Sequence, residues 1–148
     1  MARARTKDRR PYLLIEITAR RLHREVDAQL SKAAGVTASQ AAVLFLLLRR
    51  GERRVGTIGE VLALGAPAVT GLVNRMHASG LVIKRKDPSD KRGALVDLTE
   101  IGRYAAEKAD VVLRDFNLEV EDRLGPENAE LFYEALTRLA TDSDLSSH

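Results

Sequence analysis

Residues Pro67–Gly102 read PAVTGLVNRMHASGLVIKRKDPSDKRGALVDLTEIG, and their hydrophobic pattern changes from helical to strand-like near the middle. Four apolar side chains in the first part share the spacing of one buried helix face, i, i+3, i+4 and i+7: Val69, Leu72, Val73 and Met76. Further on, Leu81–Lys86 and Ala94–Leu98 are typical of short strands, and Asp87–Gly93 between them is rich in turn-forming residues. The stretch predicts a helix from Pro67 to Gly80, followed by a β-hairpin.

Before this stretch, the chain predicts two well-packed helices. The first is long, Pro11–Gly35, and these apolar positions keep helical spacing along it: Leu14, Leu22, Val26 and Leu30. A second helix spans Gln40–Arg49, and either Thr37 or Ser39 is suited to cap it. Because the run Ala41–Leu48 is apolar on all sides, this helix belongs at the centre of the core.

Three further helices complete the expected order. Thr57 followed by Glu60 is the capping-box pattern, here at the start of a short helix that ends at Gly65. After the hairpin, a long helix covers Thr99–Leu124 with Thr99 as its cap, and a last helix covers Glu127–Ala140. Three helices followed by a two-stranded hairpin are the plan of a winged helix-turn-helix, so the predicted fold is mainly α (α+β).

The composition is that of one soluble domain with its own core. Among 148 residues, 45% are hydrophobic and 30% charged. There is no cysteine, which excludes disulfides, thiolate metal sites, a cysteine nucleophile and direct thiol redox sensing. The longest apolar run, Ala41–Leu48, is far shorter than a membrane span, so we expect a cytoplasmic protein with no membrane partner.

Charge is unevenly distributed along the chain. Residues 49–103 carry a net charge of +5, whereas residues 104–148 carry −7. Residues 1–10 add a further +4. This polarity indicates a molecule with one end suited to a polyanion and the other turned away from it, although ordinary solvated faces would give the same totals.

Motifs around the hairpin closely resemble those of the multiple antibiotic resistance regulator (MarR) family. They are Leu81-Val82-x-x-Arg85, Asp87-Pro88-x-Asp90-x-Arg92 and Val96-x-Leu98-Thr99-x-x-Gly102. The preceding Ala68-Val69-Thr70-x-x-Val73-x-Arg75 resembles the recognition helix of that family, and the resemblance covers about residues 11 to 140. It implies a homodimeric transcriptional regulator whose first and last helices pair with those of a second subunit.

The expected organisation is one domain with two short tails. Residues 11–140 form the domain, with the winged helix-turn-helix at about 37–98 and dimerisation helices at about 11–34 and 110–140. Residues 1–10 are a basic flexible tail and residues 141–148 a frayed C-terminus. The long helices carry more apolar side chains than a small core can cover, which also favours a dimer: Tyr12, Leu13, Leu14, Phe116, Leu131, Phe132 and Leu136.

On the recognition helix, five residues are expected to face the major groove: Ala68, Thr70, Gly71, Asn74 and Arg75. Asn is geometrically matched to the N6 and N7 atoms of adenine, so Asn74 is the candidate for reading a base. Arg75 is suited to phosphate or guanine, and the alternative role for it is an ion pair with a neighbouring helix.

Six residues of the hairpin are expected to contact DNA: Lys84, Arg85, Lys86, Asp90, Lys91 and Arg92. Asp90 can hold the Arg92 guanidinium extended toward a narrow minor groove, although the same pair could merely close the loop. The lysines and Arg85 would follow phosphates, or form only a solvated face. A cluster in the N-terminal tail is either a minor-groove arm or an aid to solubility: Arg3, Arg5, Lys7, Arg9 and Arg10.

Enzymatic activity is not expected. His23, His77 and His148 are far apart and have no partner at metal-ligand spacing, and phosphate-binding and nucleophile-elbow motifs are missing from the sequence. Asp87 and Asp90 lie among cations that keep carboxylates ionised, which does not suit acid catalysis. The sequence therefore predicts no catalytic residue, no cofactor and no metal.

The sequence thus predicts a homodimer that binds a palindromic operator in double-stranded DNA and represses transcription. Two alternatives stay open: an architectural DNA-binding protein that responds to no ligand, and a protein-interaction module on the same fold. The family resemblance implies a small aromatic or anionic effector bound between the dimerisation helices and the winged unit. Four residues on the first helix are candidates for lining this site, although dimer packing explains each of them better: Tyr12, Arg20, His23 and Arg24.

Overall fold

A computed structural model describes residues 10–141 of the chain. The expectations for residues 1–9, with most of the basic cluster, and for residues 142–148 lie outside the described residues. The elements follow in the order α1 (Pro11–Ala34), α2 (Ala38–Arg50), β1 (Arg53–Arg54), α3 (Val55–Val61), α4 (Ala66–Ala78), β2 (Val82–Asp87), β3 (Asp90–Leu98), α5 (Glu100–Leu124) and α6 (Pro126–Ala140).

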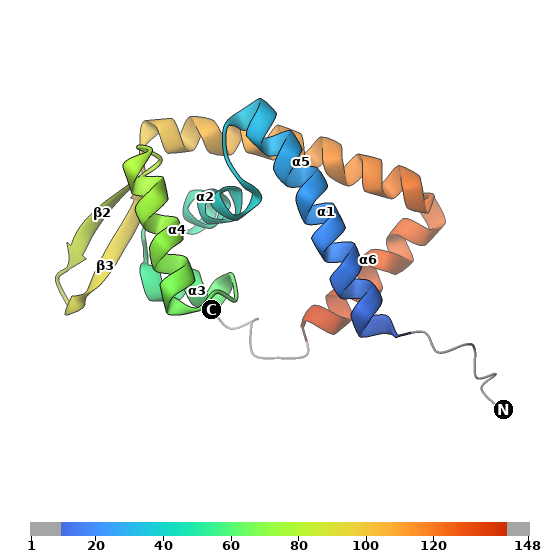
Figure 1. Cartoon of the computed structure of the whole chain (residues 1–148), viewed down its shortest axis with the longest axis horizontal. Helices are drawn as coiled ribbons and strands as arrows, with labels where there is room; N and C mark the ends of the chain where they lie inside the picture. Colours follow the sequence, from blue (N-terminus) through green and yellow to red (C-terminus); the bar gives the residue numbers. More distant parts are fainter. Residues whose placement is uncertain (1–9, 142–148) are drawn as a thin grey trace.

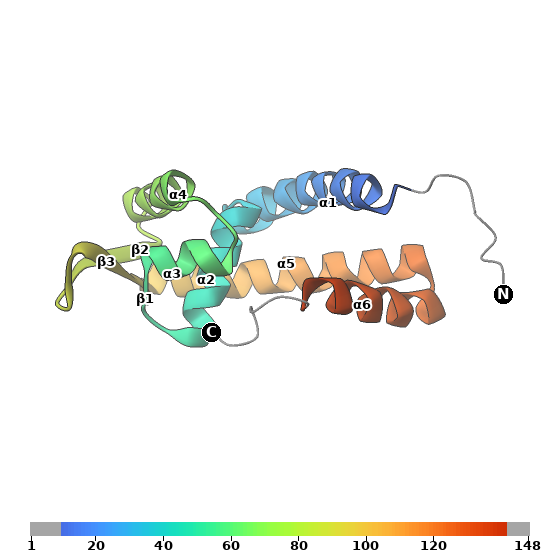
Figure 2. The same ribbon diagram turned by 90° about the horizontal axis from the view of Figure 1, so that it is seen from below.

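The elements are arranged as a winged helix-turn-helix with long flanking helices, which confirms the predicted fold. Figures 1 and 2 show α2, α3, α4 and the β2–β3 hairpin gathered at one end of the molecule, with α6 at the other. Helix α5 runs from the hairpin to α6, and α1 packs along it. The three strands form an antiparallel sheet in the order β1-β3-β2.

The core lies under α2, as the apolar run predicts. The buried residues of α2 are Ala41, Val43, Leu44, Leu46 and Leu47. The predicted buried face of α4 is also confirmed, because Val69, Leu72, Val73 and Met76 are all buried. Along α1 the prediction is only partly confirmed: Val26 and Leu30 are buried, whereas Leu14 remains exposed.

The start of α2 settles which residue caps it. The Thr37 hydroxyl accepts a hydrogen bond from the Gln40 backbone N–H at 3.1 Å, and the Gln40 side chain accepts one from the Thr37 N–H at 3.0 Å. These reciprocal contacts are a capping box, so Thr37 and not Ser39 is the cap.

The capping box predicted at Thr57 and Glu60 is wrong. Helix α3 already begins at Val55, and Arg54 precedes it with extended backbone and no side-chain cap. The reason is β1, which the sequence reading missed: Arg53 and Arg54 pair with β3, so the chain passes directly from a strand into the helix.

The predicted seven-residue linker in the hairpin is also wrong. Strand β2 extends to Asp87 and β3 begins at Asp90, so only Pro88 and Ser89 form the turn. Pairing is regular up to Lys86 opposite Ala94, and the register then shifts to Asp87 opposite Asp90. Residues 91–93 are therefore extra residues on one strand, an irregularity of the kind that redirects side chains.

Helix α5 is tied to the end of α4 at its first turn. The Thr99 hydroxyl accepts from the Gly102 N–H at 2.9 Å and lies 2.5 Å from the Gly80 carbonyl oxygen, to which it donates. A Cβ at Gly102 would overlap the backbone carbonyl of Leu81. The Leu-Thr-x-x-Gly motif thus has a structural cause, because the cap and the glycine together allow α5 to approach this turn.

No single helix within residues 10–141 is both long enough and apolar enough to cross a membrane. Two strongly bent pairs, α1 with α2 and α3 with α4, reach that length and composition only when each pair is taken together.

Candidate nucleic-acid interface

The face of α4 opposite the core carries the residues predicted to meet DNA. Ala68, Thr70, Asn74 and Arg75 are exposed, and Gly71 is half-buried. This orientation follows from the helical repeat, since the large apolar side chains of α4 are all directed into the core: Val69, Leu72, Val73 and Met76. The structure therefore brings the five predicted residues onto one accessible surface.

Asn74 has a partner on the hairpin. The Lys84 ammonium donates a hydrogen bond to the Asn74 side-chain oxygen at 2.7 Å. Lys84 lies on β2, so this contact joins the outward face of α4 to the wing. Neither residue was predicted to contact the other, because nothing in the sequence spacing shows which strand position stands beside which helix position.

Arg75 lies back along its own helix. Its guanidinium nitrogen Nη1 would be 3.2 Å from a Cβ at Gly71, one turn earlier. The alternative that Arg75 forms an ion pair with a neighbouring helix finds no support among the described residues, where no carboxylate contacts it. The guanidinium therefore remains available to an external anion.

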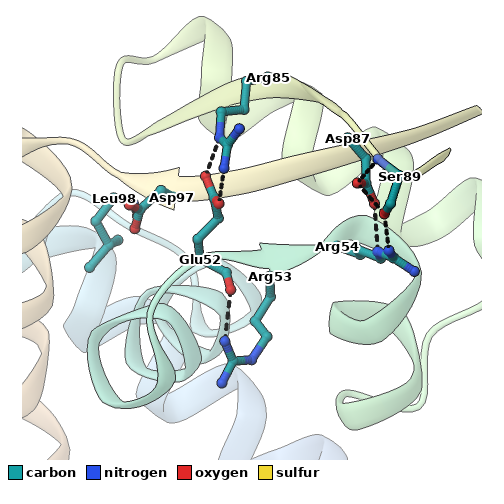
Figure 3. A network of polar contacts seen from close by, with 8 residues as sticks. All are labelled: Glu52, Arg53, Arg54, Arg85, Asp87, Ser89, Asp97 and Leu98. Atoms are coloured by element: carbon teal, nitrogen blue, oxygen red, sulfur yellow. Dashed lines mark hydrogen bonds and ion pairs between the residues drawn. The ribbon is translucent and has the colours of Figure 1, made fainter. Parts of the chain in front are cut away.

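Arg85 is held differently from the lysines beside it. Its guanidinium makes a bidentate contact with Glu52, Nε to Oε2 at 2.7 Å and Nη2 to Oε1 at 2.5 Å (Figure 3). This contact holds the pKa of the Glu52 carboxyl below its ordinary value. Because side chains alternate along a strand, Arg85 lies on the opposite face of β2 from Lys84 and Lys86. Its role as a phosphate contact stays a prediction.

Buried Asp87 organises the tip of the wing. Its carboxylate accepts hydrogen bonds from the Ser89 N–H at 2.9 Å and hydroxyl at 2.7 Å, and pairs with Arg54 Nε at 2.6 Å (Figure 3). The Ser89 hydrogen bonds, followed by the Arg54 charge, lower the pKa of Asp87, so the carboxylate stays ionised as expected. Arg54 also bonds the Ser89 hydroxyl at 2.6 Å.

Arg54 is a residue of this region that sequence reasoning missed. It belongs to a two-residue strand, which is too short to produce a periodic pattern, and its partner Asp87 is 33 positions away. The only signal in the sequence is a pair of arginines between two helical segments.

The predicted ion pair between Asp90 and Arg92 is not formed. The Asp90 carboxylate instead accepts a hydrogen bond from the Arg92 backbone N–H at 2.9 Å, and none of the ion pairs among residues 10–141 joins the two side chains. Asp90 and Arg92 are two residues apart at the irregularity of β3, where a short carboxylate reaches the nearby backbone amide more easily than the end of a long side chain. Arg92 and Lys91 are both exposed at the irregularity of β3.

A groove of about 870 Å³ separates α3 and α4 from the wing. The charged residues of its lining are three cations from three different strands, Arg54, Lys84 and Arg92, and two carboxylates, Glu60 and Asp90. The N-terminus of α4, which has no side-chain cap, opens onto the same groove at Ala66. Basic side chains and free backbone N–H groups at a helix start both favour an anion, so the groove is suited to a phosphate chain.

A second hollow lies on α1, away from the wing. It has a volume of about 430 Å³ and is lined by Ala19, Arg20, His23 and Arg24. Three of the four residues named as candidates for an effector site thus surround one hollow, whereas Tyr12 lies apart from it. Among the residues that the structure describes, no three His, Asp or Glu side chains are grouped so as to hold a metal ion.

Comparison with known proteins gives a consistent result. The sequence model of the MarR family matches residues 34–93. The uncharacterized HTH-type transcriptional regulator YkoM of Bacillus subtilis is 33% identical over 78 residues, which are 53% of this chain and 51% of YkoM. The chain spans about half to two thirds of the length of several curated relatives that it matches, YkoM among them.

Solved structures match over nearly the whole chain. The PcaV transcriptional regulator from Streptomyces coelicolor, in complex with its natural ligand, is 25% identical, with a TM-score of 0.74 over 97% of this chain and 100% of PcaV. BpsR of Bordetella bronchiseptica, whose DNA binding is regulated by 6-hydroxynicotinic acid, is 23% identical, with a TM-score of 0.72 over 86% of this chain and 98% of BpsR.

Proposed function

The chain belongs to the MarR family, and from this premise we propose that it is a homodimeric regulator that binds a palindromic operator, represses transcription and is released by a small ligand. The proposal is carried by one observation, the cationic groove between α4 and the wing. An exposed helix face beside such a groove suits DNA, because the helix can enter the major groove while the groove receives the sugar-phosphate chain.

The charge distribution supports this orientation. Exposed cations lie on α4 and on the wing: Arg75, Lys86, Lys91 and Arg92. The acidic part of the chain, from residue 104 on, forms α5 after its first turn and all of α6. A polyanion is therefore attracted to the winged end and repelled by the other. A protein that binds DNA must be located where the DNA is, which in a bacterium is the cytoplasm.

Exposed apolar side chains support a homodimer. At the start of α1, the exposed residues are Tyr12, Leu13, Leu14, Ile15 and Ile17; on α6 they are Leu131, Tyr133, Leu136 and Leu139. Both helices lie at the end of the molecule away from the wing (Figures 1 and 2). Phe116 must be removed from the predicted dimer surface, because it is buried in the chain's own core. A second copy of the chain would cover the others and place two α4 helices on one DNA duplex.

The hollow on α1 supports a small anionic or aromatic ligand. Arg20 and Arg24 stand one turn apart beside His23, so two cations and an imidazole border the same space. PcaV binds its natural ligand and BpsR responds to 6-hydroxynicotinic acid, so this fold accommodates small-molecule control. With no cysteine in the chain, direct oxidation of a thiol cannot provide the signal.

The test of DNA binding uses the intergenic DNA upstream of the chain's own gene. We expect the full-length protein to protect one inverted repeat, with half-sites about one helical turn apart. Arg92→Ala should weaken binding to every sequence and lower the slope of log K against log salt by about 0.9 for each phosphate that the arginine neutralises. Arg138→Ala, on α6, is the matched control and should leave that slope unchanged.

Three outcomes contradict the proposal or part of it. Binding with a steep salt slope but no sequence preference would favour an architectural protein. Failure to bind any of this DNA at low salt would favour a protein-interaction module. A thermal-shift screen of phenolic and carboxylate metabolites, repeated with operator DNA and with peroxide and chelator controls, tests the ligand. If peroxide or chelator abolishes binding and no metabolite has an effect, control by a small ligand is wrong.

A further inference from the structure

We propose that Lys84 determines base specificity: through its contact with Asn74, it makes the recognition helix prefer guanine over adenine at the base pair that Asn74 faces. This inference rests on the proposed DNA-binding function and revises one part of it. The sequence alone pairs Asn74 with adenine, whereas the contact with Lys84 changes which hydrogen-bonding groups the amide can offer.

The contact is built into the packing of the wing against α4. Lys84 shares its face of β2 with Val82, which is buried beneath α4. His77, one turn after Asn74 on the same helix, lies with Nδ1 3.1 Å from the Val82 carbonyl oxygen. A carbonyl can only accept, so Nδ1 carries the proton in this contact. The burial of Val82 and its contact with His77 hold β2 against α4. This packing places the Lys84 ammonium 2.7 Å from the Asn74 oxygen.

Adenine is a poor match for this arrangement. Its major-groove edge offers an N6 amine, which donates, and N7, which accepts, so an Asn side chain must present its oxygen to N6. In this protein the oxygen already accepts from a cation. An adenine amine that approached the same oxygen would bring its own N–H groups close to the ammonium, which is electrostatically unfavourable.

Guanine suits the same groups. Its N7 and O6 atoms are both acceptors, and the Asn74 amide nitrogen and the remaining ammonium N–H groups of Lys84 are all donors. The positive charge beside the amide oxygen also polarises the amide and strengthens its N–H donors. Asn74 and Lys84 therefore act as one unit that offers donors to two neighbouring acceptors.

The other cations of the wing do not share this position. Arg85 is on the opposite face of β2 and is engaged by Glu52, and Arg92 lies near the tip. Lys86 lies on the same face as Lys84, is exposed, and has no hydrogen bond or ion pair within residues 10–141. Lys86 thus provides a matched control, with the same residue type on the same strand face but no contact with Asn74.

The experiment measures binding of the full-length dimer to its upstream inverted repeat and to every single-base variant of that repeat. The Asn74→Ala variant first identifies the base pair that Asn74 reads: it is the position at which this substitution changes the base preference most. At this position, we expect the wild-type protein to prefer guanine over adenine by about tenfold, the discrimination typical of one good base contact. Lys84→Met should weaken binding to every variant, because Lys84 also lines the groove. It should in addition abolish or reverse the guanine preference at this position and leave the base preferences at other positions unchanged.

The control and the contrary outcomes separate this inference from the function on which it rests. Lys86→Met should weaken binding equally on all variants, with the guanine preference retained. A wild-type preference for adenine at the Asn74 position, or a guanine preference that survives Lys84→Met, would overturn the role of Lys84 while leaving the DNA-binding function intact. Absence of binding to any duplex would overturn the function and this inference together.

Discussion

The two ends of the molecule differ in how their apolar side chains are used. In the winged unit, residues 37–98, the large apolar side chains of α2 and α4 are buried or half-buried within the chain itself, apart from Leu48. In the outer helices, the first half of α1 and all of α6, nearly every apolar side chain is exposed; Ala129 is the only buried residue of α6. Helices α4 and α6 are both amphipathic by sequence, so amphipathicity alone does not tell what covers the apolar face.

This difference shows which part of the structure buries its apolar side chains within a single chain and which part leaves them exposed. The winged unit holds most of the core, the capping box of α2 and polar contacts across the sheet, as Figure 3 shows for Arg54, Asp87 and Ser89. The outer helices have a surplus of apolar surface and only exposed ion pairs such as Arg138 with Glu134. We therefore expect substitutions in the winged unit to change folding, and those in the outer helices to change association.

The largest expected effect is at the junction of the two regions. Gly102→Ala places a Cβ against the Leu81 carbonyl, a backbone atom that cannot move aside cheaply. We expect the free energy of unfolding, measured by urea denaturation, to fall by about 3 kcal/mol or more. The control is Gly56→Ala in α3, where a Cβ would meet no atom within 4 Å. Equal stability of the two variants would show that α5 does not depend on this close approach.

The second prediction concerns the outer helices. Leu14→Glu combined with Leu131→Glu introduces charges on exposed apolar surface of α1 and α6. We expect the dimer dissociation constant to rise by about a hundredfold or more, because each buried leucine contributes roughly 2 kcal/mol to association. Sedimentation velocity measures the change. Leu48→Glu, at an exposed site on α2, should leave association unaltered, and an equal effect there would mean that the dimer forms through another surface.

The third prediction uses pH to compare polar contacts. The pKa of Asp87 is lowered on folding, so its contribution to stability is present above its ordinary pKa and disappears as pH falls through the folded value. Asp87→Asn should therefore be less stable than wild type at pH 7, and the gap should narrow below about pH 4. Glu134→Gln on α6 serves as the control and should show no comparable gap, because exposed ion pairs contribute little. Urea unfolding of wild type and Asp87→Asn at pH 7 and pH 3 tests this prediction. A stability difference that is the same at both pH values would contradict the role of the ionised Asp87 carboxylate.

The smallest effect is expected in the turn between α3 and α4. Ala63 has a φ of 54°, the left-handed region, which is strained for a residue with a Cβ. Ala63→Gly should raise the free energy of unfolding by roughly 0.5 kcal/mol, since relief of strain exceeds the added entropy of the unfolded chain. Ala78→Gly near the end of α4 should instead lower stability. Thermal denaturation of both variants tests the sign, and a destabilised Ala63→Gly would show that the turn is not strained.

Sequence reasoning was most reliable where a pattern repeats along one element. The buried face of α4 and the core helix α2 were predicted from spacing and are confirmed. The boundaries of the hairpin were predicted wrongly because Lys91, Arg92 and Gly93 have the composition of a loop, although β3 includes them. Strand β1 was missed because two residues are too few to show an alternating pattern. This strand places Arg54 beside Asp87, so their ion pair was missed as well.

For the site, sequence identified which residues are exposed but not which of them touch. The outward positions of α4 followed from the helical repeat. The contacts of Asn74 with Lys84, and of Arg85 with Glu52, depend on how the wing lies against its neighbours. Such contacts are set by tertiary packing between positions 10 and 33 residues apart, for which local spacing gives no rule.

Helix α5 is long and continuous, so a small tilt at one of its ends produces a large displacement at the other. With 25 residues, the helix is about 37 Å long, and its first turn is fastened to the end of α4 by Thr99. A tilt of about 5° about its far end would displace the wing by about 3 Å, as much as a whole hydrogen-bond length. If two wings on one duplex moved in this way, the distance between them would change by several ångströms, and their contacts with the phosphates could not all be kept. If a second copy of the chain holds the far end of α5, a small angular change there would therefore shift the wing relative to bound DNA.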